Sequence, residues 1–276
     1  MTQQQNPVLV LGGNGKTGRR VAARLRERGV GVRLGSRSAT PSFDWEDPAT
    51  WPAAIEGTSA AYISYYPDLA VPGAPEAIDA FAKQAIASGV RRLVLLSGRA
   101  EEEAQRAEEA LHASGADWTI VRCSWFNQNF SEGYLLDAVL SGEVALPAGD
   151  VPEPFVDADD IADVATLALT EPGHEGRIYE LTGPRLLSFA EAVGEIAAAT
   201  GRSIQFVPVP IEDYAAVLEE AGLPDDLVGL IRYLFTEVLD GRNAHLNDGV
   251  QQALGRPARD FSDYVRTAAA SGVWDV

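Results

Sequence analysis

The chain lacks the residues that build disulfides and most metal centres. Its 276 residues include one cysteine, Cys123, and three histidines, His112, His174 and His245. A single cysteine excludes an intramolecular disulfide, a Cys-x-x-Cys redox pair and a cysteine-based zinc site. Because the histidines are isolated and form no His-Glu-x-x-His pattern, we predict no catalytic metal. We expect Cys123 to be a small buried residue.

Long apolar runs and positive charge are also scarce. No segment approaches the roughly 20 apolar residues that cross a bilayer, and residues 1–7 lack the charged and apolar regions of a secretory signal. We therefore expect a cytoplasmic protein with no membrane partner. The formal net charge of −18 repels polyphosphate, so we expect no nucleic-acid partner. A small-molecule substrate fits better, and the sequence leaves a monomer and a homodimer both open.

What the sequence does contain is a glycine-rich loop between an apolar run and the start of a helix. The run Val8–Leu11 leads into glycines spaced three apart and then into Arg19–Leu25. Glycines let the backbone approach a pyrophosphate, whose charge then meets free N–H groups and the positive end of the helix dipole. A plain strand-to-helix turn is the alternative. We predict a dinucleotide site with these candidate contacts: Gly12, Asn14, Gly15, Lys16, Thr17 and Gly18.

The end of the next strand bears on which dinucleotide is bound. A strand-like run, Val30–Leu34, leads into Ser36 and Arg37, and no Asp or Glu occurs between Gly29 and Phe43. An NAD site usually places an acidic residue there for the ribose 2′-hydroxyl, whereas a 2′-phosphate needs cationic or neutral donors. We therefore predict NADP(H) as the cofactor, with Ser36 and Arg37 as contacts. The alternative is that Arg37 is a solvated loop residue.

Strand and helix signals alternate through the first two thirds of the chain. Beyond the first two strands, we expect strands over 60–65, 92–97, 118–122 and 177–182, and helices over 51–57, 76–88, 101–114 and 161–169. This alternation predicts an α/β fold: a doubly wound parallel Rossmann sheet with a smaller, mainly helical C-terminal lobe. Helices over 189–200, 212–221 and 225–239 belong to that lobe. We assign residues 1–130 and 155–183 to an NADP-binding Rossmann domain, and residues 131–154 and 184–276 to a small substrate lobe.

Several polar and aromatic residues follow the expected strands. Ligands of such sheets bind beyond the carboxyl ends of the strands, where Tyr65, Tyr66, Ser97 and Arg99 lie. We take Ser97, Arg99 and Tyr65 as candidate catalytic residues and Tyr66 as a substrate contact. For Ser97 and Arg99 the alternative is a capped turn with a solvated arginine.

The loop after the next strand is rich in aromatic residues. Trp125, Phe126, Asn127 and Phe130 are further candidate substrate contacts, because aromatic walls stack on a flat acceptor and an amide orients it. Core packing of at least two of these aromatic residues is the competing expectation. In the last lobe helix, one apolar face predicts core packing: Leu227, Leu230, Ile231, Leu234, Phe235 and Val238.

Three aspartates, Asp157, Asp159 and Asp160, look like a carboxylate cluster for a metal. We interpret Asp159 or Asp160 instead as the N-cap of the helix that follows, since aspartate is a preferred capping residue.

Further segments complete a pattern that runs in order along nearly the whole chain. With the Gly12–Gly18 loop and Ser36–Arg37, they are Ser114–Arg122, Trp125–Phe130, Phe155–Ala162, Tyr179–Pro184 and Leu254–Phe261. On these residues the chain resembles the NmrA-like branch of the atypical short-chain dehydrogenases. The resemblance implies an NADP-binding Rossmann domain and a small substrate lobe, in a family that holds quinone reductases, ether and iminium reductases, and non-enzymatic redox sensors. The segments 255–261 and 97–99 look most like the ergot-alkaloid iminium reductases.

One signature of short-chain dehydrogenases is missing. In Tyr-x-x-x-Lys the lysine lowers the pKa of the tyrosine, which passes a proton to the carbonyl oxygen. The only lysines are Lys16 and Lys83, and Gly12 and Asp79 stand four positions before them. A ketone builds an alkoxide that demands a proton donor, whereas an iminium or a quinone needs no strong acid. We predict an NADPH-dependent reductase of a flat iminium or quinone acceptor. The alternative is an NADP(H)-sensing regulator that binds a protein partner.

Overall fold

The computed structural model describes residues 6–276, and these separate into two compact units. Unit 1 contains the described residues up to Cys123 together with Ala158–Leu181 and Gly249–Arg256. Unit 2 contains Ser124–Asp157, Thr182–Asp248 and Pro257–Val276.

Unit 1 is built on a six-stranded parallel sheet. In sheet order the strands are β2 (Val32–Gly35), β1 (Val8–Leu11), β3 (Ala60–Ile63), β4 (Arg92–Gly98), β5 (Asp117–Cys123) and β7 (Arg177–Leu181). β4 and β5 pair over their whole length, from Arg92 opposite Asp117 to Gly98 opposite Cys123. The strand order reverses between β1 and β3, and open α/β sheets bind their ligands at such a reversal.

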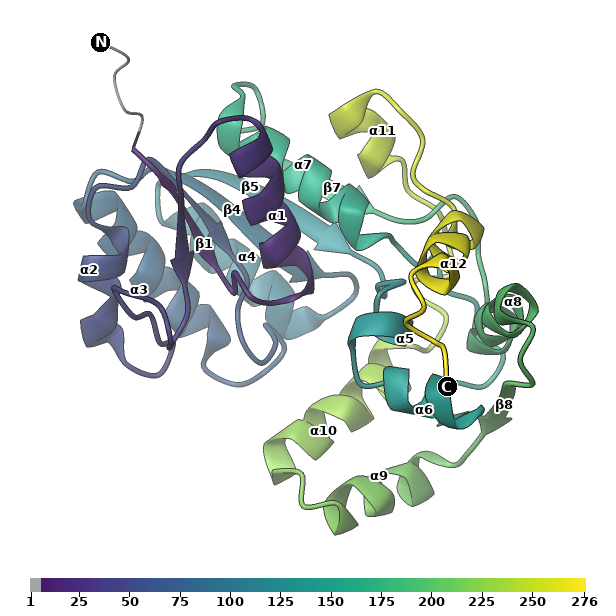
Figure 1. Cartoon of the computed structure of the whole chain (residues 1–276). Helices are drawn as coiled ribbons and strands as arrows, with labels where there is room; N and C mark the ends of the chain where they lie inside the picture. Colours follow the sequence, from purple (N-terminus) through teal and green to yellow (C-terminus); the bar gives the residue numbers. More distant parts are fainter. Residues whose placement is uncertain (1–5) are drawn as a thin grey trace. The chain divides into compact units, whose positions relative to one another are not determined.

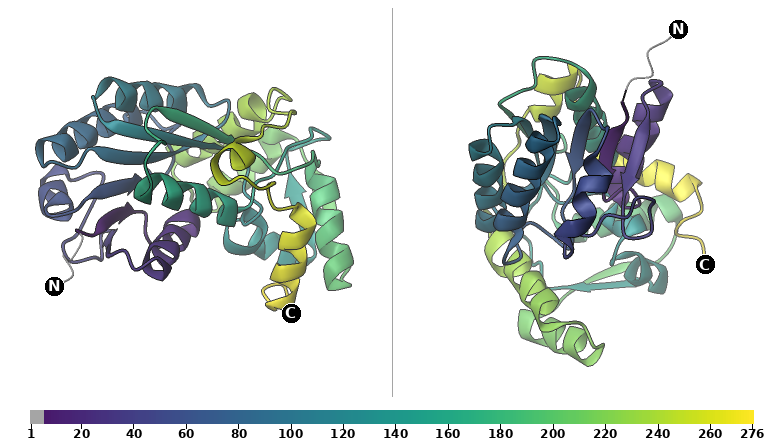
Figure 2. Two further views of the ribbon diagram at one scale, coloured as in Figure 1. Left: turned by 90° about the horizontal axis from the view of Figure 1, so that it is seen from above. Right: turned by 90° about the vertical axis from the view of Figure 1, so that its left-hand side faces the viewer.

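Helices cover both faces of this sheet (Figures 1 and 2). α1 (Lys16–Glu27) and α7 (Ala158–Thr170) lie side by side on one face, and α2 (Trp51–Ile55), α3 (Ala74–Ala87) and α4 (Glu102–Ala113) cover the other. Successive side chains of a strand point to opposite faces. Leu9 and Leu11 accordingly join the core beneath α2, α3 and α4, while Val8 and Val10 are buried as well, as expected for a sheet covered on both sides.

Unit 2 has an aromatic core and little sheet. Its helices are α5 (Asn129–Glu132), α6 (Leu136–Ser141), α8 (Phe189–Thr200), α9 (Ile211–Glu220), α10 (Asp225–Tyr233) and α12 (Phe261–Ala270). β6 (Glu143–Leu146) and β8 (Gln205–Pro208) form a two-stranded parallel sheet. The core includes Phe130, Phe155, Phe189, Phe261 and Trp274. α8 begins at a capping box, in which Ser188 and Glu191 satisfy each other's backbone N–H groups.

The predicted fold class is confirmed, and the division of the chain differs from the predicted boundaries. Residues 124–130 and 155–157 group with unit 2, where Phe126 pairs with Val156. Residues 249–256, which contain α11 (Gly249–Leu254), group with unit 1 because α11 packs on β7 and α7. A Cβ at Gly249 would lie 2.2 Å from the Glu180 carbonyl oxygen, so the close approach of α11 to β7 requires glycine.

The last expected lobe helix is shorter than predicted. α10 ends at Tyr233 and continues as a π-helical turn over Leu234–Val238. Phe235 and Val238 are buried in this turn, which agrees with core packing. Among residues 6–276, no helix has the length and apolar character needed to cross a membrane.

Candidate active site

The glycine-rich loop joins β1 to α1, as predicted, and leaves the start of α1 open. Gly15 is the N-cap residue, no side chain caps the helix, and its first turn contains no acidic residue. The first N–H groups of a helix have no acceptor within that helix, and the helix dipole adds positive partial charge there. Asn14 and Gly15 are exposed beside this turn. The arrangement fits a bound pyrophosphate.

Two glycines of the loop are needed for its own packing. Gly12 has φ +63°, in the left-handed region. A Cβ at Gly18 would lie 2.2 Å from the Gly12 carbonyl oxygen, which no rotation of a side chain relieves. Gly15 differs, because its φ is −78° and a Cβ there would meet only the Gly12 oxygen, at 3.2 Å. A side chain at Gly15 therefore makes a tight contact, for which the loop must shift by a few tenths of an ångström, and not the severe clash expected at Gly18.

Thr17 has an interior role in this loop. Its side chain is buried, and its Oγ1 accepts a hydrogen bond of 3.0 Å from the hydroxyl of Tyr62 on β3. Burial raises the pKa of Tyr62, so this phenol keeps its proton and donates. The bond ties the first turn of α1 to the sheet, and a cofactor contact through Thr17 stays a prediction.

Arg37 is exposed just beyond β2. The Ser36 carbonyl accepts hydrogen bonds from the N–H groups of Ala39 and Phe43, at 3.1 and 2.9 Å, which folds the loop around this position. Within residues 6–276, no hydrogen bond or ion pair engages the Arg37 guanidinium. An unengaged guanidinium suits a phosphate, because it forms charge-assisted hydrogen bonds.

Tyr65 and Tyr66 both follow β3, in different settings. The half-buried ring of Tyr65 packs on Trp45 with 4.8 Å between ring centroids, whereas Tyr66 is 72% exposed. Burial, followed by the charges of Glu46 and Glu76, raises the pKa of the Tyr65 phenol. Tyr65 thus keeps its proton at neutral pH.

Ser97 and Arg99 belong to a buried charged network that the sequence analysis missed. Ser97 Oγ donates a hydrogen bond of 2.6 Å to Glu108 Oε1. The Arg122 guanidinium donates to both Glu108 oxygens and, at 2.7 Å, to Glu180 Oε1. Arg99 Nε lies 3.7 Å from Glu180 Oε2. No local signal reveals this network, because Glu108 lies among several acidic residues of one helix.

This network changes the interpretation of both residues. Arg99 is only 3% exposed, so the expectation of a solvated arginine is wrong. Its ion pair with Glu180 gives the charge a partner inside the protein. Ser97 is also buried and holds a carboxylate. Catalytic roles for Ser97 and Arg99 stay predictions.

Two further carboxyl groups, also missed by the sequence analysis, lie near the end of β4. Asp68, in the loop after β3, and Glu101, just before α4, lie near each other. The Glu101 carboxyl lies against Gly98, where a Cβ would be 2.0 Å from Oε1. Burial and then the charge of Asp68 raise the pKa of Glu101 well above its ordinary value. Among the described residues, the adjacent Ala100 is the one non-glycine residue with positive φ, +58°.

In unit 2 the four candidate substrate contacts divide into two kinds. Phe130 and Asn127 are fully buried. Phe130 belongs to the aromatic core, and the Asn127 side-chain amide donates toward Asp157 at 3.5 Å. Trp125 and Phe126 are half-buried, and Trp125 leans on the core with ring centroids 5.4 Å from Phe189. Trp125 and Phe126 are the pair whose surface a ligand can reach without moving the core.

Asp159 and Asp160, at the start of α7, do not occupy its N-cap position. The helix begins at Ala158, so Asp159 and Asp160 lie within its first turn and the N-cap interpretation is wrong. They pair with arginines instead: Asp160 Oδ1 lies 2.7 Å from the guanidinium of Arg256, and Asp159 Oδ1 accepts from Arg24 at 2.6 Å. Among residues 6–276, no His, Cys, Asp and Glu side chains gather in a group that suits a metal ion.

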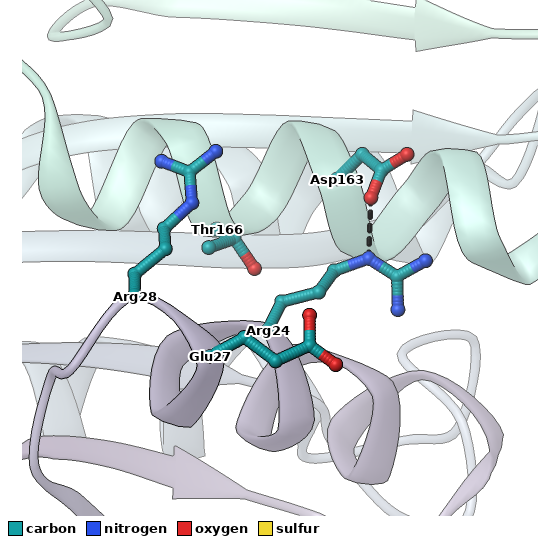
Figure 3. A pocket seen from close by; sticks show the side chains of 5 residues that line it. All are labelled: Arg24, Glu27, Arg28, Asp163 and Thr166. Atoms are coloured by element: carbon teal, nitrogen blue, oxygen red, sulfur yellow. Dashed lines mark hydrogen bonds and ion pairs between the residues drawn. The ribbon is translucent and has the colours of Figure 1, made fainter.

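A polar pocket lies between α1 and α7 (Figure 3). Its lining is Arg24, Glu27, Arg28, Asp163 and Thr166, and Arg24 Nε donates to Asp163 across it. These α1 residues are at the end of the helix opposite to Gly15. The pocket is therefore separate from the predicted phosphate cradle.

Comparison with known proteins agrees with this arrangement. Residues 12–172 match a family model described as NAD(P)H-binding. Agroclavine dehydrogenase of Claviceps fusiformis is 32% identical over 94% of this chain and 96% of its own. The NAD(P)H azoreductase of Xenophilus azovorans is 30% identical over 96% and 98%. The structure of an NADPH-dependent quinone oxidoreductase from Escherichia coli, complexed with NADPH, superposes with a TM-score of 0.73 at 22% identity, over 94% of this chain and 99% of that one.

Proposed function

Because the chain belongs to the NAD(P)H-binding, NmrA-like family of atypical short-chain dehydrogenases and is an NAD(P)H-dependent oxidoreductase, we propose that it is an NADPH-dependent reductase of a flat, unsaturated acceptor. The nicotinamide supplies the hydride when it is bound. The protein supplies the phosphate cradle, the choice of dinucleotide and a surface for the acceptor.

The exposed Arg37 is the observation that supports NADPH over NADH. It follows β2, at the position where NAD-binding sheets carry an acidic residue, and no Asp or Glu occurs between Gly29 and Phe43. The uncapped start of α1 offers free N–H groups to the pyrophosphate. The guanidinium of Arg37 is available to the 2′-phosphate. Gly12, Asn14, Gly15, Lys16, Thr17, Gly18 and Ser36 complete the proposed cofactor site.

The missing Tyr-x-x-x-Lys pair supports iminium and quinone acceptors. Hydride addition to an iminium carbon yields a neutral amine, and addition to a quinone yields a delocalised phenolate. A simple ketone instead yields a localised alkoxide, which needs a donor aligned on its oxygen during hydride transfer. We propose Tyr66, Trp125 and Phe126 as acceptor contacts, because each keeps exposed aromatic surface.

Hydride transfer itself tests this proposal. NADPH that carries deuterium at the transferred position of C4 should be consumed more slowly than NADPH in the presence of a cyclic iminium, and the deuterium should appear on the reduced carbon. NADPH bound tightly but left unconsumed by iminium and quinone acceptors alike would favour the sensor, in which cofactor binding reshapes a surface for a protein partner.

A further inference from the structure

Trp274 is buried in the core of unit 2, although the residues that follow it are exposed. Its side chain is 0% exposed, whereas Asp275 and Val276 lie on the surface. The indole packs against the ring of Tyr264 on α12, with 6.0 Å between ring centroids and 87° between ring planes. An indole also brings a polar group into the core, the Nε1–H, which needs an acceptor there.

A glycine turn directs Trp274 into this core. α12 ends at Ala270, and Gly272 follows with φ +75°, in the left-handed region that glycine adopts without strain. The N–H of Gly272 donates to the Ala269 carbonyl and its carbonyl accepts from the Asp275 N–H, each at 3.1 Å. The turn ends the helix, and the chain leaves α12 toward α5 and α6 (Figure 1).

The indole of Trp274 satisfies a carbonyl group of α5. Its Nε1–H donates a hydrogen bond of 2.9 Å to the carbonyl oxygen of Phe130. α5 has only four residues, so its carbonyl groups find no donor within the helix itself. Phe130 is fully buried, and without the indole its carbonyl would bear an uncompensated desolvation cost.

The backbone of Trp274 is held as well. The guanidinium of Arg202, just after α8, donates to the Trp274 carbonyl at 2.9 Å and to the Leu140 carbonyl at 2.6 Å. Leu140 lies in the last turn of α6, where the carbonyl groups carry negative partial charge. Trp274 is therefore fixed at two points, by its indole to α5 and by its carbonyl, through Arg202, to α6.

The loop that contains Trp125 and Phe126 is fixed at its start by backbone pairing. The N–H of Val156 donates to the Trp125 carbonyl at 2.8 Å, and the Val156 carbonyl accepts from the Asn127 N–H at 2.9 Å. This pairing holds the entrance of the loop. The other end of the loop leads into α5.

Side chains of the C-terminal segment hold that other end. Trp274 binds the Phe130 carbonyl, and the Tyr264 hydroxyl donates to Ser131 Oγ at 2.8 Å. A loop that is fixed at both ends presents the aromatic surface between them in one position. A small displacement of a positioning surface lowers the rate of a reaction strongly, because the reacting atoms must be aligned within a narrow distance.

We propose that Trp274 is a positioning residue for the acceptor and acts, through the Phe130 carbonyl, on the surface formed by Trp125 and Phe126. This inference rests on the proposed function, which assigns that surface to the acceptor. Trp274 acts without touching the acceptor, because its side chain is fully buried. Loss of its N–H should weaken acceptor binding and leave NADPH binding intact, since the glycine-rich loop and Arg37 belong to unit 1.

The test uses two tryptophans that make the same kind of hydrogen bond in different units. Trp274→Phe keeps an aromatic ring in the core and removes the N–H donor. Trp51→Phe is the matched control, because Trp51 is also buried and its Nε1–H donates 2.7 Å to the Asp44 carbonyl in unit 1. Tyr264→Phe keeps its ring, removes the bond to Ser131, and decides the question if Trp274→Phe does not fold.

KM and kcat are measured with 1,4-naphthoquinone and with N-methyl-3,4-dihydroisoquinolinium, and NADPH affinity by fluorescence titration. Trp274→Phe should raise KM for both acceptors by about tenfold, as expected for the loss of a buried hydrogen bond, and leave the dissociation constant of NADPH within about twofold. Tyr264→Phe should raise KM in the same way by about threefold.

The control separates positioning from a general loss of stability. Trp51→Phe should lower the urea midpoint of unfolding about as much as Trp274→Phe does, since both lose one buried indole-to-carbonyl bond. It should nevertheless leave both acceptor KM values within about twofold.

Hydrogen exchange gives a measurement that needs no turnover. The backbone amides of residues 124–135 should exchange faster in Trp274→Phe than in the unaltered protein, and at the unaltered rate in Trp51→Phe. Faster exchange together with an unchanged acceptor KM would show a purely structural role and overturn the inference.

Unchanged KM values in both Trp274→Phe and Tyr264→Phe, or an equal rise of KM in Trp51→Phe, would likewise overturn the inference and leave the proposed function standing. Turnover of neither acceptor by the unaltered protein would refute the proposed function, and the acceptor role of Trp274 with it. A rise of acceptor KM confined to Trp274→Phe and Tyr264→Phe, with NADPH affinity retained, is the result that the inference expects.

Discussion

The hydroxyl of Ser97 donates a hydrogen bond of 2.6 Å to Glu108 Oε1. Both residues are buried, and the same carboxylate accepts from Arg122. Ser97, at the end of β4, therefore holds the carboxylate of Glu108 on α4, and this carboxylate in turn orients Arg122 on β5. A buried carboxylate that loses one of its donors bears part of its desolvation cost uncompensated.

Ser97→Ala should consequently act on stability. We expect a loss of about 1–3 kcal/mol in the free energy of unfolding, measured by urea titration. Ser203→Ala, an exposed site, should change this free energy by no more than about 0.5 kcal/mol. If Ser97→Ala keeps full stability and instead abolishes NADPH oxidation, Ser97 acts on cofactor or substrate directly.

The exposed guanidinium of Arg37 predicts the dinucleotide preference. A charge-assisted contact to phosphate contributes about 1.5–3 kcal/mol, so Arg37→Ala should weaken NADPH binding by roughly tenfold or more and affect NADH little. Arg26→Ala removes the same charge from an exposed site of α1 and serves as the control. Fluorescence titration gives both affinities, and identical NADPH and NADH curves for the unaltered protein would rule out this assignment.

Valine at Gly15 and valine at Gly18 should cause different defects, the first in cofactor binding and the second in stability. Gly15→Val should abolish NADPH binding with little change in circular dichroism, because the side chain projects into the phosphate cradle and not into the fold. Gly18→Val should destabilise the fold itself, since its Cβ would lie 2.2 Å from the Gly12 carbonyl oxygen. Normal NADPH binding by a folded Gly15→Val protein would place the phosphate site elsewhere.

The raised pKa of Glu101 predicts a pH-dependent stability in the absence of cofactor. A carboxyl group whose pKa is higher in the folded protein stabilises it fully below the ordinary glutamate pKa, and this contribution is lost as the pH rises through the raised value. The free energy of unfolding should therefore fall with pH more steeply in the unaltered protein than in Glu101→Gln. Parallel pH curves for the two proteins would show that Glu101 titrates normally.

The sequence predicted those structural features that are determined by residues close together in the chain. The Gly12–Gly18 loop and the alternation of strands and helices both follow from residues close together in the chain. β6 and β8 escaped prediction because neither belongs to the alternation of strands and helices, and each is stabilised by a partner about 60 positions away.

The carboxyl groups of the site escaped prediction for a related reason. Glu108 and Glu101 stand in one acidic stretch, where a solvated helix face is the ordinary expectation. Glu108 is paired with Arg122, from β5, and Glu101 lies near Asp68, from the loop after β3. Such pairs arise only when the parallel sheet brings the ends of distant strands together.

Steady NADPH consumption across a panel of acceptors tests the central claim most directly. The purified protein should oxidise NADPH with 1,4-naphthoquinone or a cyclic iminium ion, well above the uncatalysed rate, and should show little turnover with simple aliphatic ketones. Robust reduction of aliphatic ketones, or no consumption with either favoured class, would contradict the claim that this chain is a reductase of flat, unsaturated acceptors.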